Sequence, residues 1–242
     1  MKKTKIYDLE VNTIKKDIKN IHLAVCPPDG QVRLAVPIKT TDEAIKLLIA
    51  DKMPWIKKQQ KKYSQQERQT KREYVSGESH YFLGNRYRLN VITSDTKPRI
   101  EVKKKNYIDM YITPQMSTEK RTRLMESFYR AELKRQIPAL VNYWSKTTGL
   151  TVNEVKIKKM KTKWGTCNPE QKRIWLNLEL AKTPTRCLEY VLIHELMHLK
   201  EKHHNEQFEQ LIKTYLPQWE QCKQELNNNP LGFAEWPTTN AQ

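Results

Sequence analysis

Two histidines four positions apart, with a glutamate directly after the first, form the strongest candidate for chemistry: His194-Glu195-Leu196-Met197-His198. Residues four apart share one face of a helix, so both imidazoles can bind one metal ion. Zinc lowers the pKa of a bound water to about 7, and a neighbouring carboxylate can take its proton during attack. The spacing therefore predicts a catalytic metal, with His194 and His198 as ligands and Glu195 as the general base.

The surroundings of this motif strengthen the prediction. Four of the six histidines of the chain lie between positions 194 and 204. Leu188, Val191 and Leu192 precede the motif, which indicates a helix buried in a core. Polar imidazoles in a core need partners, and a shared metal ion supplies one.

A catalytic zinc takes a third protein ligand and keeps one open position. On a straight helix His203 and His204 would be rotated by about 140° and 240° from His198, so the helix must end or bend before the third ligand. His204 has the spacing used by metzincins, in which a glycine makes the bend at the position of Glu201. His203 is the alternative imidazole ligand. Oxygen ligands are offered by the carboxylates of Glu201, Glu206 and Glu209.

The first third of the chain shows the alternation typical of strands. Apolar residues alternate over 21–25 and 32–36, and the Pro-Pro-Asp-Gly sequence between them predicts a hairpin. Thr40 and Glu43 form a capping box that opens a helix reaching Lys62, and Pro54 should bend it.

The segment 63–75 is polar and predicts a linker. A second hairpin follows over 81–92 with its turn at Gly84-Asn85, and further strands are expected at 100–102 and 107–112. No repeat of 20–50 residues is visible.

The second half is richer in helical patterns. A long helix is predicted over 117–148, kinked at Pro138 and stopped by Gly149. Strands are expected at 155–157 and 174–178, with a turn at 164–167. Thr183 is predicted to cap the motif helix, with Pro184 as its first residue. The inward face of the long helix should carry Leu124, Phe128, Ala131, Leu133 and Leu140.

These elements predict an α+β protein with two parts. Residues 1–115 form a basic, β-rich N-terminal region with one helix. Residues 116–242 form a helical domain with a small sheet and the metal-binding motif on one of its helices.

Basic residues outnumber acidic ones by 44 to 27, giving a net charge of +17. The densest basic segment runs between Lys52 and Arg72, with eight basic residues and one acid, Glu67. Such a field attracts polyanions, so a nucleic acid is a possible partner, and a solvated, soluble surface is the alternative.

The composition also bears on location. The four cysteines are far apart and include no Cys-x-x-Cys pair, which favours reduced thiols in the cytoplasm. No apolar run approaches the roughly 20 residues of a membrane span, so no membrane association is expected.

The sequence resembles the YgjP-like metal-dependent hydrolases, which are relatives of the SprT-like and other minimal zincin peptidases. The resemblance is most specific from about residue 155 to 220. Thr166 replaces the usual serine of the family, and His203 replaces an asparagine. The matching residues are Lys163-Trp164-Gly165-Thr166-Cys167, Leu176-Asn177, Tyr190-Val191, the run His194 to Leu199, His204-Asn205, Phe208 and Leu216-Pro217.

This resemblance implies a zincin-like domain in which His194, His198 and His204 hold one Zn²⁺ ion and Glu195 acts as general base and acid. The implied activity is a metallopeptidase acting on protein or peptide substrates. A metal-dependent nucleotide phosphoanhydride hydrolase of the nucleoside triphosphate pyrophosphatase type is the alternative, as is a nucleic-acid-associated protease tethered by its basic N-terminal region. Tyr190 and Tyr215 are candidate donors to an oxyanion.

Overall fold

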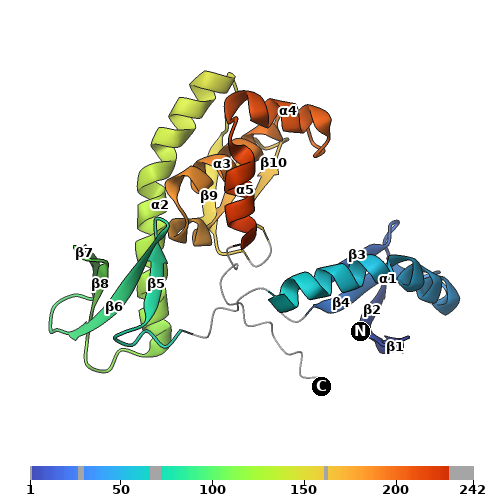
Figure 1. Ribbon diagram of the computed structural model, residues 1–242, viewed down its shortest axis with the longest axis horizontal. Coiled ribbons are helices and arrows are strands. Elements are labelled where there is room, and N and C mark those ends of the chain that lie inside the picture. Colours follow the sequence, from blue (N-terminus) through green and yellow to red (C-terminus); the bar gives the residue numbers. More distant parts are fainter. Residues whose placement is uncertain (1, 27–29, 66–71, 161–162, 229–242) are drawn as a thin grey trace. The chain divides into compact units, whose positions relative to one another are not determined.

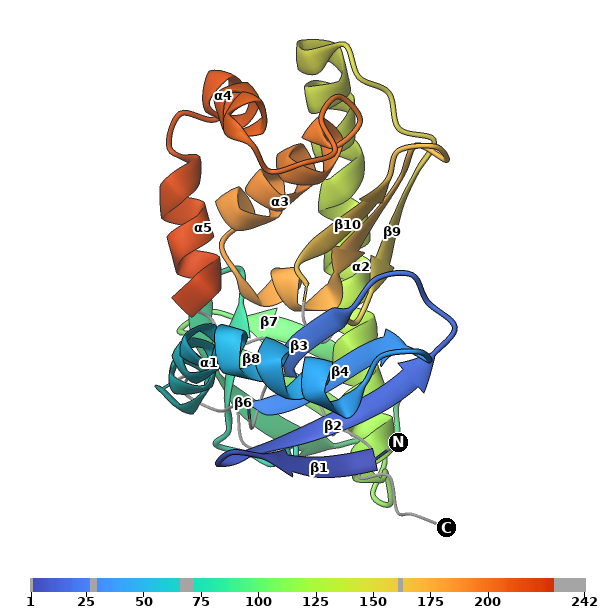
Figure 2. The same ribbon diagram turned by 90° about the vertical axis from the view of Figure 1, so that its right-hand side faces the viewer.

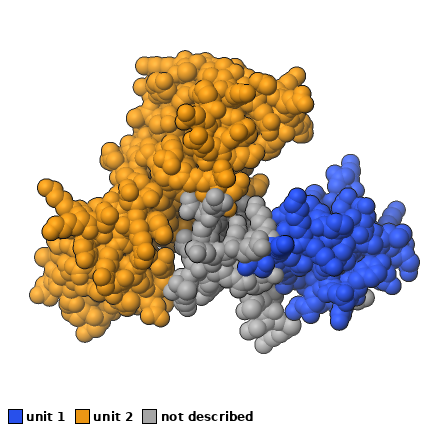
Figure 3. All heavy atoms as spheres, in the orientation of Figure 1, with its two compact units in different colours: residues 1–68 blue, residues 69–242 orange. Residues whose placement is uncertain are grey.

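The computed structural model describes residues 2–26, 30–65, 72–160 and 163–228. The chain divides into two compact units, Met1–Arg68 and Gln69–Gln242 (Figure 3). Both combine sheets with helices, which confirms the α+β class. Within these described ranges, no helix combines the length and the apolar character that crossing a bilayer requires.

Unit 1 is a four-stranded sheet with one helix against it (Figure 1). The strands β1 (Lys2–Ile6), β2 (Leu9–Lys16), β3 (His22–Cys26) and β4 (Gln31–Pro37) are ordered β1-β2-β4-β3. β2 and β4 are parallel, and the other pairs are antiparallel. The predicted hairpin is confirmed as β3 and β4, while its turn residues 27–29 lie outside the described ones.

The helix of unit 1, α1 (Asp42–Gln65), seals the core of the sheet. Ile45, Ile49 and Ile56 face inward from α1 and are buried with the two valines and the leucine of β4. The cap is Thr41 and not the predicted Thr40, because Thr41 Oγ1 accepts the N–H of Ala44 at 3.2 Å. Pro54 lies inside α1 without ending it.

Unit 2 begins with a second four-stranded sheet (Figure 2). The strands β5 (Ser79–Phe82), β6 (Asn85–Thr93), β7 (Arg99–Lys103) and β8 (Tyr107–Ile112) are ordered β5-β6-β8-β7. The prediction of a turn at Gly84-Asn85 was wrong by one position. Phe82 pairs with Asn85, so the turn residues are Leu83 and Gly84, with φ of 48° and 81°.

The long helix α2 (Thr118–Thr148) has the predicted ends. Ser117 Oγ accepts the N–H of Lys120, and Gly149 ends the helix with a φ of 69°. Pro138 lies inside it. Of the predicted inward face, Leu133 is buried and Ala131 is exposed. Leu124, Phe128 and Leu140 are half-buried against the core. The larger side chains take the inward positions: Met125, Tyr129, Leu133, Ile137 and Trp144.

The remaining elements of unit 2 surround the motif helix. A three-stranded sheet, ordered β10-β11-β9, consists of β9 (Glu154–Lys158), β10 (Gly165–Asn168) and β11 (Arg173–Asn177). The helical elements are the 3-10 helix η1 (Leu178–Lys182), α3 (Thr185–Met197), α4 (Glu206–Tyr215) and α5 (Trp219–Asn228). The prediction of a turn at 164–167 was wrong, because Gly165 to Cys167 pair with β11 as a strand.

The domain boundary expected near residue 115 falls inside unit 2. Residues of the β5–β8 sheet, of α2 and of α3 share one continuous core, exemplified by Met110, Leu133 and Ile193. Because α2 packs on both the sheet and the motif-bearing helices, no boundary forms at its start. The division between the units falls within the predicted linker 63–75.

Candidate metal centre

The motif helix α3 is buried on almost every face and anchored to α2. Trp144 Nε1 donates a hydrogen bond to Glu189 Oε1 at 2.8 Å, joining the two helices. The predicted cap was wrong: Thr183 Oγ1 donates to the carbonyl of Leu180 and ends η1, and Pro184 precedes α3 without a side-chain cap. Core packing therefore takes the place of capping in holding α3.

The structure brings His194, His198 and His204 together. One ligand nitrogen from each lies within 4.8 Å of the others. His194 Nε2 and His204 Nε2 are 2.9 Å apart. The centroids of the three rings are 4.7 to 5.1 Å from one another. The predicted pair on α3 is thus completed by His204 from the following loop.

The alternative ligands do not join this cluster. His203, Glu206 and Glu209 are exposed and lie outside the histidine group. Glu201 supports the loop instead. Its backbone carbonyl lies 3.0 Å from His198 Nδ1, and its Oε1 accepts the N–H of His203 at 3.0 Å.

The bend that delivers His204 is made without glycine. After α3 ends at Met197, the N–H of Leu199 bonds to the carbonyl three residues before it. Asn205 Oδ1 then accepts the N–H of Phe208 at 2.9 Å and opens α4. No residue from 198 to 205 has a positive φ. Tightened turns and a side-chain cap therefore replace the glycine of the metzincin pattern.

The donor set fits a zinc ion. Donation from His198 Nδ1 to the Glu201 carbonyl leaves the Nε2 lone pair for a metal, the usual arrangement around metal-bound imidazoles. Burial, together with the neighbouring His198 and His204, lowers the pKa of His194 to about 3, so its imidazole is neutral, as a ligand must be. His194 Nδ1 is buried without a partner among the described residues. Three converging imidazoles match catalytic zinc sites.

Phe208 of α4 closes the back of the cluster. Its ring centroid lies 4.6 to 4.9 Å from the centroids of all three imidazoles, and its side chain is fully buried. In the sequence, only the family resemblance singles out Phe208. Its contact with all three rings could not be derived from spacing, because it depends on how α4 folds back onto α3.

Glu195 lies beside the histidines in a nearly dry environment. Burial raises the pKa of its carboxyl to about 8, against an opposing effect of Lys163. Strand β10 passes directly over this side chain. A Cβ atom on Gly165 would stand 2.6 Å from Glu195 Oε1 and 2.7 Å from its Cγ. The absence of a side chain at Gly165 is therefore what makes room for the carboxylate.

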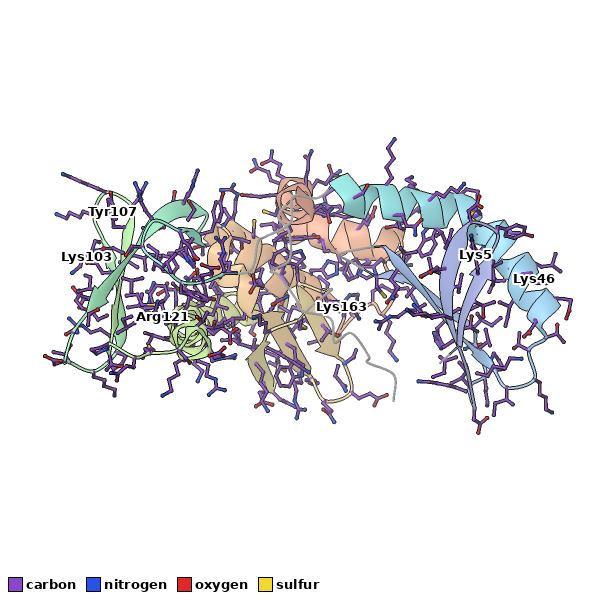
Figure 4. The ribbon with its side chains drawn as sticks, turned by 90° about the horizontal axis from the view of Figure 1, so that it is seen from below. Lys5, Lys46, Lys103, Tyr107, Arg121 and Lys163 are labelled. Atoms are coloured by element: carbon purple, nitrogen blue, oxygen red, sulfur yellow. The ribbon has the colours of Figure 1, made fainter. Side chains whose placement is uncertain are left out.

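The three histidines and Glu195 line a cleft of about 760 Å³ whose other wall is β10. Tyr190 also lines the cleft, whereas Tyr215 packs edge-on against Trp144 and does not. Cys167 faces the cleft as a neutral thiol, because burial and the Glu195 carboxylate raise its pKa to about 11. Lysines contribute positive charge at the rim, namely Lys163, Lys202 and Lys223 (Lys163 is labelled in Figure 4).

A buried asparagine fixes the start of β10. Asn177 Nδ2 donates to the carbonyls of Met160 and Lys163 at 2.9 and 2.7 Å. Its Oδ1 accepts the N–H groups of Met160 and Glu179, both at 3.2 Å. The sequence shows an asparagine after an apolar strand, but only the fold reveals that it holds the loop leading to the cleft.

The chain has partial similarity to two metallopeptidase zymogens of known structure. No curated protein sequence matches the chain. Among solved structures, the metallopeptidase zymogen abylysin of Pyrococcus abyssi is 20% identical, with a TM-score of 0.35 over 38% of this chain and 91% of that one. The zymogen jannalysin of Methanocaldococcus jannaschii is 24% identical, with a TM-score of 0.34 over 38% and 93% of the two chains.

The family assignment rests on the sequence. Residues 19–229, most of the chain, match the family model described as the YgjP-like metallopeptidase domain. The histidine cluster and its buried glutamate lie within the matched region. The chain is therefore a metal-dependent hydrolase that belongs to the YgjP-like metallopeptidase family.

Proposed function

We propose that this chain is a zinc-dependent peptidase with one catalytic ion held by His194, His198 and His204. The observation that carries the proposal is the convergence of three imidazole nitrogens within 4.8 Å, with the buried carboxyl of Glu195 on the same helix. A closed structural zinc site usually has four Cys or His ligands. Three protein ligands facing a cleft favour a catalytic ion instead.

When bound, zinc polarises a carbonyl and lowers the pKa of water. Glu195 takes the proton of the attacking water and passes it to the leaving nitrogen. Its burial suits this exchange, because a carboxyl whose pKa lies near neutrality both accepts and releases a proton readily. Contact with the backbone at Gly165 keeps the carboxylate in one place.

The substrate that best fits the cleft is an extended polypeptide. β10 forms one edge of its sheet and lines the cleft, so its outer backbone groups can pair with a peptide strand. Tyr190, which lines the cleft, is the proposed donor to the developing oxyanion. The rim lysines favour acidic side chains in the substrate.

The test is Glu195→Gln, compared with Glu209→Gln as a control that removes an exposed carboxylate near the site. We expect casein turnover to fall by about 10²-fold or more in Glu195→Gln, since it loses its general base. The control should keep full turnover, and metal analysis should give about one zinc per chain in both. Undiminished turnover in Glu195→Gln would overturn the mechanism.

A nucleoside triphosphate is the second candidate substrate, because the same three rim lysines suit a polyphosphate. Parallel assays with casein and with nucleoside triphosphates, each with zinc or magnesium, separate the two. Phosphate or pyrophosphate release without proteolysis would favour phosphoanhydride hydrolysis.

We also propose that the basic segment from Lys52 to Arg72 binds nucleic acid. Lys52, Lys57, Lys58 and Lys61 are exposed along α1, and residues 66–71 lie outside the described ones. A mobility-shift assay across a salt series tests this, since phosphate contacts weaken steeply with salt.

The free thiols of all four cysteines support a cytoplasmic location.

A further inference from the structure

Unit 1 and the first part of unit 2 are two copies of one module. The strand orders β1-β2-β4-β3 and β5-β6-β8-β7 correspond, the parallel and antiparallel pairs correspond, and a helix follows each sheet. Three pairs of landmarks are 76 residues apart: the hairpin turns at Tyr7 and Leu83, the starts of β4 and β8 at Gln31 and Tyr107, and the starts of α1 and α2 at Asp42 and Thr118. This spacing exceeds the 20–50 residues over which the sequence shows no repeat.

In unit 2 the space between the first hairpin turn and the helix is filled by η1. The N–H of Leu83 donates to the carbonyl of Ala181 at 3.0 Å, and that of Gly84 donates to Lys182 at 3.1 Å. Lys182 Nζ lies 5.6 Å from the ring centroid of Tyr129 on α2. Buried apolar side chains of η1, including Leu180, complete the contact. This module thus holds a short helical segment with apolar residues and a lysine.

The corresponding space in unit 1 is an open groove of about 720 Å³. Tyr7 and Asp8 of the hairpin turn line one side, and Ala50 and Met53 of α1 line the other. Met53 stands 76 residues before Tyr129, so the groove lies where η1 sits in the other copy. Within the described part of unit 1, no segment occupies the place of η1.

The hairpin turn at the groove shares its first residue conformation with the turn that holds η1 in unit 2. Tyr7 is 62% exposed and has a left-handed φ of 55°, close to the φ of 48° of Leu83. The second turn residues differ, because Gly84 has a φ of 81° and Asp8 has no positive φ. Among the described residues, no hydrogen-bond partner is seen for the N–H groups of Tyr7 and Asp8. In unit 2 the equivalent N–H groups bind η1.

The charge of the groove defines its occupant further. Asp8 and Glu10 stand where the other copy has Gly84 and Arg86, and both line the groove. Lys57 of α1 also lines the groove, but the two carboxylates beside the turn outnumber it and favour a basic side chain in the occupant. This local acidity contrasts with the net charge of +17 of the chain.

We propose that this groove of unit 1 binds a short helical turn of a partner polypeptide that carries two apolar side chains and a lysine or arginine. A backbone carbonyl of the segment accepts the N–H group of Tyr7, as the carbonyl of Ala181 in η1 accepts that of Leu83 in unit 2. Its basic side chain faces Asp8 and Glu10. The site is separate from the histidine cluster and independent of the proposed peptidase activity.

The probe is a synthetic peptide with the sequence of residues 177–184, Asn-Leu-Glu-Leu-Ala-Lys-Thr-Pro. Titration into the full chain, followed by amide NMR, should shift the Tyr7 and Asp8 signals. Ala50→Arg places a long side chain in the groove and should weaken binding by about tenfold or more. Leu47→Arg is the matched control, since Leu47 is 72% exposed on the same helix and does not line the groove.

A charge exchange tests the predicted basic side chain. Asp8→Lys should weaken binding of this peptide about threefold to tenfold and restore part of the loss for a peptide with glutamate in place of lysine. Amide spectra of both variants away from the groove should match the parent. The proposal is overturned if about 1 mM peptide causes no shifts at Tyr7 and Asp8. It is equally overturned if Ala50→Arg binds the peptide as well as Leu47→Arg does.

Discussion

Replacing Gly165 by alanine tests whether the backbone of β10 positions the catalytic carboxylate. The new Cβ would stand 2.6, 2.7 and 2.9 Å from Oε1, Cγ and Cδ of Glu195, whereas ordinary contacts begin at 3.4 Å. Gly165 has no positive φ, so alanine suits the backbone, and the three atoms nearest to the new Cβ all belong to Glu195. Because Cγ clashes as well as the carboxylate, rotating the carboxylate alone does not relieve the overlap.

The size of the effect follows from this overlap. The Glu195 side chain must move by about 0.5–0.8 Å, and a misplacement of about 1 Å costs on the order of 10²-fold in rate. We therefore expect casein turnover to fall by about 10²-fold in Gly165→Ala. Crowding in the core should lower the free energy of unfolding by about 1–3 kcal/mol. Zinc content should stay near one per chain, because the histidines are untouched.

Gly149→Ala is the matched control. Its Cβ meets nothing within 4 Å, but its φ of 69° imposes a strain of about 1–2 kcal/mol on alanine. It therefore lowers stability to a similar degree without contacting Glu195, and turnover should stay at the parent level. In a Glu195→Gln background, Gly165→Ala should cause little further loss. Turnover of Gly165→Ala within about threefold of the parent would refute the positioning argument.

Three further predictions concern the ligands, the cleft loop and pH. His204→Ala should weaken zinc binding by about 10²-fold or more, measured by competition with a chelator, whereas His203→Ala should bind zinc like the parent. Asn177→Ala should lower the free energy of unfolding in urea by about 2–4 kcal/mol, because it leaves part-buried backbone groups of residues 160 and 163 unpaired; an unchanged midpoint would contradict the anchoring role. In metal-free protein, the pKa of Glu195 is raised from 4.5 to about 8, so the folded state retains a proton that the unfolded state loses, and this contribution to stability disappears as pH rises through that interval. Glu195→Gln has no titrating carboxyl here, so its free energy of unfolding relative to that of the parent should increase between pH 5 and pH 8. If the difference between the two free energies stayed constant over this range, the pKa of Glu195 would not be raised.

Local patterns in the sequence determined much of the site. Helical periodicity placed His194 and His198 on one face with Glu195 beside them, because the spacing of residues along a helix is fixed by its geometry. The rotation of about 100° per residue also required the helix to stop before a third ligand. Alternating apolar residues predicted the strands β3, β4, β7 and β8 for the same reason, since every second side chain of a strand points to the same face of the sheet.

Only the tertiary structure decided the features that depend on distant segments. The choice of His204 over His203 depends on the path of the loop between α3 and α4, and the contact of Gly165 with Glu195 depends on β10 pairing with β11. Because the second sheet and α3 share one core, the chain divides at residue 68 and not at the expected residue 115. The 76-residue repeat of the fold could not be recognised from the sequence. Two copies of a fold need apolar side chains only at the same buried positions, and many different apolar side chains satisfy one such position.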